Sequence, residues 1–191
     1  MIHLEDIFET FPQLETERFI LREITFDDAP DVFRIYTDPA VMRYWGSGPM
    51  QSIEEARRKI EAIGAAFRAR EGIRWGITSK GDDRLIGSCG HWRLMKQHFR
   101  SEIGYELAPE HWGQGLMTEA IGAIVRFGFE RIGLHSVEAQ IDPDNLASRK
   151  VLEKLGFVQE GYFRENYCLD GQFTDTAVFS LLRARWQEKL Q

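Results

Sequence analysis

One strand–helix–strand segment in the middle of the chain constrains the fold more than any other part of the sequence. The strand-like run Glu102–Leu107 is followed by two glycines, Gly113 and Gly115, and then by an apolar helical pattern. His135–Ile141 comes next and alternates apolar and polar residues as a strand does. Two strands joined by a helical crossover lie parallel in a sheet, so this segment predicts one parallel strand pair.

The glycine turn in this segment predicts a phosphate-binding site. Trp112–Thr118 stands where a strand passes to a helix N-terminus, and such a turn exposes backbone N–H groups at the positive end of the helix dipole. The turn carries no lysine, so backbone N–H groups would hold the phosphates. The Lys–Ser/Thr pair of a P-loop is absent, and Leu116 and Met117 do not supply the third glycine of a dinucleotide fingerprint.

The remaining pattern predicts an α+β fold with a mixed, mostly antiparallel sheet flanked by helices. Short, turn-rich connections indicate that three successive strands form an antiparallel meander. The strands expected outside the central segment are Phe19–Ile24, Ile73–Thr78, Leu85–Leu94, Phe157–Tyr167 and Phe173–Leu182, the last two joined at an Asp170–Gly171 hairpin turn. The expected helices run from an Asp27 N-cap to near Asp38, from Ser52, with a capping box to Glu55, to about Arg70, and over Ala147–Leu155 before Gly156.

Composition limits the classes of protein and of partner. The 191 residues are 43% hydrophobic, which fits a single domain over residues 1–191. A net charge of -6 argues against general nucleic-acid or membrane binding, both of which need basic patches. No signal peptide or membrane-spanning run is visible, so a cytoplasmic protein is expected. Cys89 and Cys168 lie in no CxxC pair and near no histidine cluster, so we expect reduced, partly buried thiols and no metal site.

Six short segments, taken in order, resemble a known family. The segments are Leu14–Arg22, Glu102–Leu107, Trp112–Gly115, Asn145–Ser148, Leu152–Phe157 and Glu160–Gly161. They resemble the GCN5-related N-acetyltransferase (GNAT) superfamily, and within it the RimJ/RimL-type branch that acetylates N-terminal amines of ribosomal proteins. The resemblance covers nearly the whole chain. Two residues depart from the broader superfamily pattern: Trp112 replaces Gln or Arg, and Met117 replaces Gly or Ala.

The resemblance implies a seven-stranded sheet whose parallel pair splays apart to hold acetyl-CoA. The pyrophosphate would bind N–H groups at the helix start, and the pantetheine arm would pair with strand backbone as a false strand. The Leu107 N–H would polarise the thioester carbonyl. The implied cofactor-binding residues are Tyr105, Leu107, Trp112, Gly113, Gln114, Gly115, Leu116, Met117, Thr118 and Asn145.

Acetyl transfer to an amine needs a base for the ammonium proton, and an acid can protonate the departing thiolate. Glu102 and Glu106 share one face of their strand, so either could serve as the base, directly or through water. A solvated strand charge is the alternative interpretation of both. His91 on the neighbouring strand is a third candidate, although a single histidine is more often structural.

Asn145 and Ser148 begin a helix, where Asn and Ser are common for reasons of capping alone. The resemblance implies in addition that Asn145 bonds the pantetheine amide and that Ser148 reaches the CoA sulfur. Many members of the superfamily use a tyrosine further along this helix, and none stands there in this chain. Ser148 therefore becomes the catalytic candidate near the thiolate, although a serine hydroxyl is a poor acid by itself.

The sequence thus predicts an acetyl-CoA-dependent N-acetyltransferase that acts by direct transfer, with no metal and no covalent acyl-enzyme. The resemblance favours a protein N-terminal α-amine as acceptor, of the ribosomal-protein alanine or serine type. The alternatives are a small-molecule amine and a non-catalytic acyl-CoA-binding regulatory module, and a homodimer stays open. Tyr44–Trp45 and Trp92 are interpreted either as lining of the acceptor cleft or as core. Arg57–Lys59 is interpreted as a solvated helix face.

Overall fold

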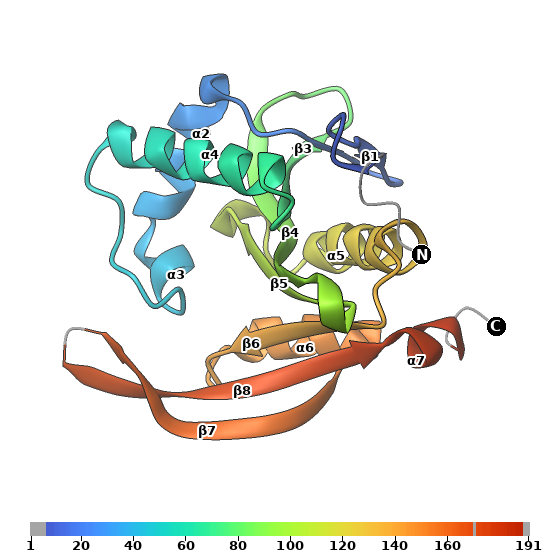
Figure 1. Ribbon diagram of the computed structural model, residues 1–191. Coiled ribbons are helices and arrows are strands. Elements are labelled where there is room, and N and C mark those ends of the chain that lie inside the picture. The colour runs from blue at the N-terminus through green and yellow to red at the C-terminus, as the bar shows by residue number, and fades with distance from the viewer. Residues whose placement is uncertain (1–6, 170, 189–191) are drawn as a thin grey trace.

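The computed structural model describes residues 7–169 and 171–188 and contains one mixed sheet of eight strands (Figure 1). The spatial order of the strands is β1-β2-β3-β4-β5-β6-β8-β7. The strands are β1 (Leu14–Glu15), β2 (Phe19–Arg22), β3 (Ile73–Ser79), β4 (Leu85–Met95), β5 (Arg100–Leu107), β6 (Ser136–Ile141), β7 (Val158–Leu169) and β8 (Gln172–Leu182).

Helices cover both faces of this sheet. They are α2 (Ala29–Thr37), α3 (Pro39–Met42), α4 (Ile53–Arg68), α5 (Leu116–Phe127), α6 (Leu146–Leu155) and α7 (Arg183–Glu188). A π-helical turn, Gly128–Ile132, continues α5. No helix among the described residues is long and apolar enough to cross a membrane.

The pairing of the strands confirms the α+β prediction of a mostly antiparallel sheet with one parallel pair, β5 and β6. The expected number of seven strands is wrong, because β1 forms a short eighth strand beside β2. Thr16 turns the chain between them: its backbone N–H donates to the Phe19 carbonyl at 3.0 Å, and its Oγ1 accepts from the Phe19 N–H at 3.0 Å. Two residues are too few to show a strand periodicity in the sequence.

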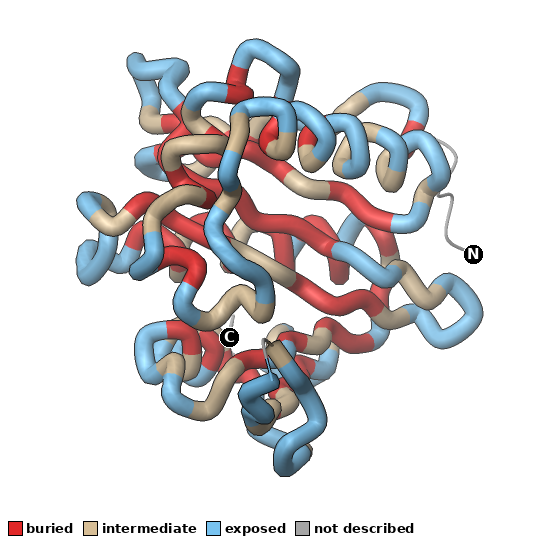
Figure 2. Tube along the Cα trace, turned by 90° about the vertical axis from the view of Figure 1, so that its left-hand side faces the viewer, coloured by how far each residue is buried: buried red, intermediate tan, exposed pale blue. Residues whose placement is uncertain are grey.

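Alternating residues of β4 show how the two layers of the core are divided. Leu85 packs in a cluster with α2, α3 and α4, whereas Ile86 packs in the larger cluster with α5. Successive side chains of a strand point to opposite faces, so α2–α4 and α5 lie on opposite sides of the sheet. In Figure 2 the buried segments run through the middle of the sheet, and exposed segments gather on the outer helices and loops.

Two helix starts differ from the sequence prediction in detail. Ser52 is the N-cap of α4 as predicted, but its side chain makes no cap hydrogen bond, and the Glu55 carboxylate accepts from the Gln51 N–H at 3.2 Å instead. Before α2 the capping box is formed by Thr25 and Asp28 instead of an Asp27 cap, with the Thr25 N–H donating to Asp28 Oδ2 at 2.8 Å. Which of several adjacent polar residues forms a cap depends on the entry angle of the chain.

The last two strands form a long β7–β8 hairpin along the lower edge of the molecule in Figure 1. Gly171 has a φ of +78°, which suits the predicted turn, whereas Asp170 lies outside the described residues. Cys89 is buried and Cys168 is exposed, both as free thiols, so the expectation of partial burial is wrong for Cys168.

Candidate active site

The parallel pair β5–β6 opens into a fork. In the described chain, β5 pairs with β6 only where Arg100–Glu102 lies beside Ser136–Glu138. Beyond Glu102 the strand β5 continues to Leu107 beside β4 alone, while β6 continues beside β8. The second half of β5 therefore has one backbone edge that no neighbouring strand covers.

Leu107 lies on this uncovered edge, and Trp112 marks its direction. The next residue, Ala108, donates its N–H to the Ile86 carbonyl on the β4 side at 2.8 Å. Backbone groups of successive strand residues point to opposite sides, so Leu107 points toward the fork. Trp112 Nε1 donates to the Leu107 carbonyl at 2.7 Å, which leaves the Leu107 N–H as the group available to a ligand. The family resemblance implies Trp112 as a cofactor-binding residue of the turn, but sequence reasoning missed this contact of its indole.

The glycine turn after β5 has the geometry of an anion-binding helix start. Gly113 and Gly115 have φ values of +75° and +74°, which favour glycine, and nothing lies within 4 Å of either position where a Cβ would be. Gly115 is the N-cap of α5. Leu116 and Met117 turn their side chains into the core, so the large Met117 does not obstruct the turn.

Tyr105 and Ser148 meet across the fork. Tyr105 extends from β5 and its hydroxyl lies 2.5 Å from Ser148 Oγ in the first turn of α6. Asn145 is the N-cap of α6, and its Oδ1 accepts from the Ser148 N–H at 3.0 Å. Burial raises the pKa of Tyr105 to about 12, and the Ser148 hydroxyl lowers it in part. A tyrosine hydroxyl from β5 thus lies beside Ser148, a contact that only the tertiary structure reveals.

Glu102 stands where the fork begins. It is the last β5 residue beside β6, and it is 6% exposed. Burial raises the pKa of Glu102 to about 7, while Arg93 at 3.3 Å lowers it and the adjacent Glu138 raises it further. A carboxyl with a pKa near neutrality is suited to accept a proton from an ammonium group.

Glu106 has a different environment, although it shares a strand face with Glu102. Its carboxylate is buried, forms an ion pair with Arg74 of β3 and accepts a hydrogen bond from Ser88 of β4. The Arg74 Nε donates to Ser88 Oγ at 2.6 Å, which closes a three-residue network. The Glu106 carboxylate therefore belongs to a network that joins β3, β4 and β5. Sequence reasoning missed Arg74. Its partner position on β4 is Gly90, where an added Cβ would lie 2.9 Å from the Arg74 Cβ.

His91 is a core residue and has no free ring nitrogen. Its Nε2 lies 2.8 Å from the Ile124 carbonyl and its Nδ1 lies 2.7 Å from Ser101 Oγ. Because a carbonyl only accepts, Nε2 carries the proton and Nδ1 accepts from the serine. Burial lowers the pKa of His91 to about 4, so the ring is neutral at pH 7. These contacts support the interpretation of His91 as a structural residue of the core.

The aromatic residues divide between core and surface. Trp45 is partly buried against the α2–α4 cluster. Trp92 is 42% exposed and is the β4 residue that pairs across the strands with Glu102. Lys59 is not part of a solvated face as predicted, because its Nζ lies 4.3 Å from the centre of the Tyr36 ring and burial lowers its pKa.

Among the described residues, no group of three or more His, Cys, Asp or Glu side chains is arranged to hold a metal ion.

Comparisons with known proteins agree with this geometry. Residues 18–158 match the family described as acetyltransferase (GNAT) domain. The chain is 42% identical over 175 residues to the uncharacterized N-acetyltransferase YoaA of Bacillus subtilis, covering 92% of this chain and 99% of that protein. It is 28% identical over 186 residues to the Escherichia coli [ribosomal protein uS5]-alanine N-acetyltransferase, covering 91% and 92%. The solved structure of Mycobacterium smegmatis RimJ with CoA-disulfide superimposes with a TM-score of 0.82 at 21% identity, covering 90% and 87%.

Proposed function

This chain belongs to the acetyltransferase (GNAT) domain family and is an N-acetyltransferase, and from that premise we propose that it transfers acetyl from acetyl-CoA to the N-terminal α-amine of a protein. The single observation that carries the donor half of the proposal is the fork between β5 and β6, with Glu102 at its origin. The acceptor half rests on the uS5-alanine relative, which aligns over nine-tenths of both chains.

The residues around the fork fit acetyl-CoA. The uncovered edge of β5 offers backbone groups of Tyr105 and Leu107 to the amides of a pantetheine arm. The Gly113–Met117 turn offers N–H groups at a helix start to a pyrophosphate. When bound there, acetyl-CoA supplies an acetyl group activated as a thioester, which the Leu107 N–H polarises.

Proton transfer is divided between the two sides of β5. Glu102 accepts the proton of the acceptor ammonium group, because its raised pKa makes it a base near neutral pH. Tyr105 and Ser148 lie on the opposite side, and burial keeps the Tyr105 hydroxyl protonated at neutral pH, so this pair would deliver a proton to the departing sulfur. The C–N bond forms as the C–S bond breaks, and the second proton that the amine nitrogen loses restores the hydroxyl pair. Asn145 holds the Ser148 backbone and thereby fixes the position of this hydroxyl pair.

A protein acceptor also agrees with the surface near the mouth of the site. The Tyr167 hydroxyl on the hairpin donates to the Gly46 carbonyl at 2.9 Å, and the Tyr44 hydroxyl donates to the Asp144 carbonyl at 3.3 Å. The loop after α3 thus bridges the hairpin and the start of α6. Phe163 and Phe173 of the hairpin are 55% and 64% exposed, which offers apolar contact area to a polypeptide.

The acceptor is tested by comparing amines at equal concentration with the purified protein and acetyl-CoA. The panel contains peptides beginning with alanine and with serine, the alanine peptide with its α-amine blocked and an internal lysine kept, and spermidine. Release of free CoA thiol reports turnover, and fragment mass spectrometry locates the acetyl group. We expect acetylation of the free α-amines alone.

Each other outcome has a defined meaning. Turnover with spermidine or with the blocked peptide, but not with free α-amines, overturns the acceptor proposal in favour of a small-molecule or lysine acetyltransferase. Tight CoA binding without thiol release from any amine favours an acyl-CoA-binding module. Failure of the wild-type protein to bind CoA in a calorimeter overturns the donor site itself.

A further inference from the structure

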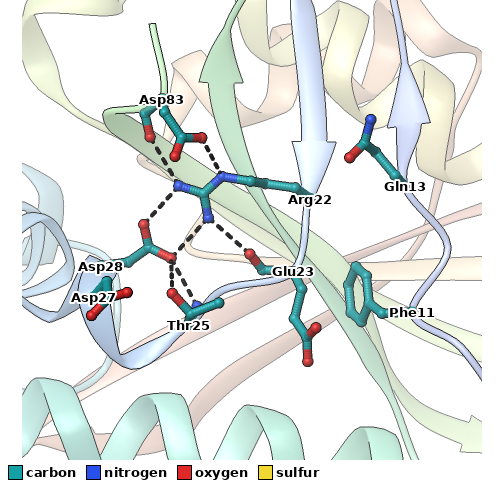
Figure 3. Close-up of a pocket in the computed structure, with 8 residues that line it drawn as sticks. All are labelled: Phe11, Gln13, Arg22, Glu23, Thr25, Asp27, Asp28 and Asp83. Atoms are coloured by element: carbon teal, nitrogen blue, oxygen red, sulfur yellow. Dashed lines mark hydrogen bonds and ion pairs between the residues drawn. The ribbon is translucent and has the colours of Figure 1, made fainter.

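The segment Leu14–Arg22 contains two arginines, and the site described so far uses neither. Arg22 is structural. Its Nε donates to Asp83 at 2.7 Å, its two Nη atoms donate to the Asp28 carboxylate at 2.7 and 2.8 Å, and Nη1 also donates to the Glu23 carbonyl (Figure 3). These bonds join the end of β2 to the start of α2 and to the β3–β4 turn.

Arg18 reaches a different part of the molecule, the glycine turn that precedes α5. Its Nη1 donates to the Gln114 carbonyl at 3.2 Å, between the two positive-φ glycines. Its Nε and its backbone N–H both donate to the Glu119 carboxylate, at 2.6 and 2.9 Å. A single residue directly before β2 thus holds the glycine turn and the first turn of α5 together.

These contacts fix the orientation of the peptide groups in the turn. A turn that binds an anion must direct its N–H groups at the ligand and its carbonyls away from it. Arg18 holds the Gln114 carbonyl on the side of β1 and β2. A cavity of about 460 Å³ lies on that side. Its charged lining residues are Glu15, Glu17, Arg126 and Glu119, and Glu119 is paired with Arg18. The Gly115 N–H belongs to the same trans peptide group as this carbonyl, so it points the other way.

Arg18 cannot act mainly as a positive charge for the ligand. The Glu119 carboxylate pairs with it and cancels its charge, and the Arg18 side chain is 44% exposed. Residues 112–118 contain neither Lys nor Arg, so the pyrophosphate would depend on well-oriented backbone N–H groups. Holding the turn in one conformation before binding lowers the entropy lost on binding.

We infer that Arg18 is a positioning residue for the pyrophosphate of acetyl-CoA, acting through the Gln114 carbonyl and Glu119. The inference rests on the proposed donor site and adds a residue that lies outside the turn and far from it in sequence. It predicts a loss of affinity that depends on the pyrophosphate of the ligand and not on its pantetheine arm or its 3′-phosphate.

The test measures dissociation constants by calorimetry for CoA, for 3′-dephospho-CoA and for pantetheine, which lacks the pyrophosphate. We expect Arg18→Ala to weaken CoA and dephospho-CoA by about tenfold, the size of one lost charge-assisted hydrogen-bond network at a partly exposed site, and to leave pantetheine unchanged. Arg18→Lys keeps the charge but not the fork of donors, so it should behave like Arg18→Ala. Arg68→Ala, which removes the surface ion pair with Glu61, is the matched control and should bind all three ligands as the wild type does.

The inference is overturned if Arg18→Ala binds CoA as the wild type does, if Arg18→Lys restores the affinity, or if pantetheine is weakened to the same degree as CoA. The first result removes any role in binding, the second makes the role one of charge, and the third makes it a general loss of structure. A wild-type protein that binds none of the ligands overturns the donor site instead, which keeps the two proposals distinguishable.

Discussion

The hydroxyl oxygens of Tyr105 and Ser148 lie 2.5 Å apart, although 43 residues separate them in the chain. The pair links the free half of β5 to the first turn of α6, across the fork where β5 and β6 part. A serine hydroxyl alone is a poor acid, but one that is hydrogen-bonded to a protonated tyrosine can pass a proton on and be resupplied.

Removing either hydroxyl of this pair should slow acetyl transfer. We expect Tyr105→Phe and Ser148→Ala each to lower kcat by roughly tenfold to a hundredfold, the range for one proton-transfer group, with little change in the dissociation constant for CoA. Because the two hydroxyls act as a unit, the double variant should lose little more than either single variant. Thiol-release kinetics measure the rates, and Tyr162→Phe, which removes an exposed tyrosine hydroxyl, is the control. Additive losses would contradict a shared pathway.

Glu102 should control the pH dependence of turnover. With a pKa of about 7, its basic form increases as pH rises through neutrality, so kcat should rise with pH and level off above about 8. Glu102→Gln should lower kcat by about a hundredfold or more and remove this rising limb. The same limb in the variant would assign the base to another group.

Glu102 also affects stability, with the opposite dependence on pH. Its folded-state pKa lies above its ordinary value of 4.5, so its contribution to stability is present below pH 4.5 and is lost as pH rises through about 7. We therefore expect Glu102→Gln to be at least as stable as the wild type at pH 8 in urea unfolding. A less stable variant at that pH would show that the ionised carboxylate supports the fold.

Glu106 should matter for stability more than for chemistry. Glu106→Gln leaves the buried guanidinium of Arg74 without its countercharge, which costs about 3 kcal/mol of unfolding free energy in comparable buried pairs. Glu61→Gln breaks the exposed pair with Arg68 and should change stability by less than about 0.5 kcal/mol. Urea unfolding measures both. If Glu106→Gln were as stable as the wild type but inactive, Glu106 would be the base.

His91 should make the fold sensitive to acid. Its folded-state pKa of about 4 lies below its ordinary value of 6.5, so its contribution is complete above pH 6.5 and is lost as pH falls through about 4. The expected loss over that interval is about 3 kcal/mol, which is the difference between the two pKa values multiplied by the free energy of one pKa unit. His91→Leu should be less stable at pH 7, where Ser101 loses its partner, but should lose less stability on acidification. An equal acid slope in both proteins would place the sensitivity elsewhere.

The sequence was sufficient for most of the elements and for their order, but not for the short elements β1, α3 and α7. Apolar periodicity and glycine positions predicted the meander β3–β5, the crossover through α5 and the terminal hairpin, because these signals are local. The cap residues were predicted less well. Asp28 forms the capping box with Thr25, whereas Asp27 was expected as the cap, since neighbouring polar residues compete for the same N–H groups.

In the candidate active site, too, some features follow from the sequence and others from the tertiary structure. The sequence by itself determined that Gly113 and Gly115 form a turn at a helix start, because only glycine adopts those φ angles without strain. The tertiary structure alone decided that burial raises the pKa of Glu102 while Glu106 is held by Arg74, and that the Tyr105 hydroxyl lies beside that of Ser148. Two glutamates on one strand face are equivalent in sequence. Their burial and their partners on other strands differ, and these set the energy of their charged forms.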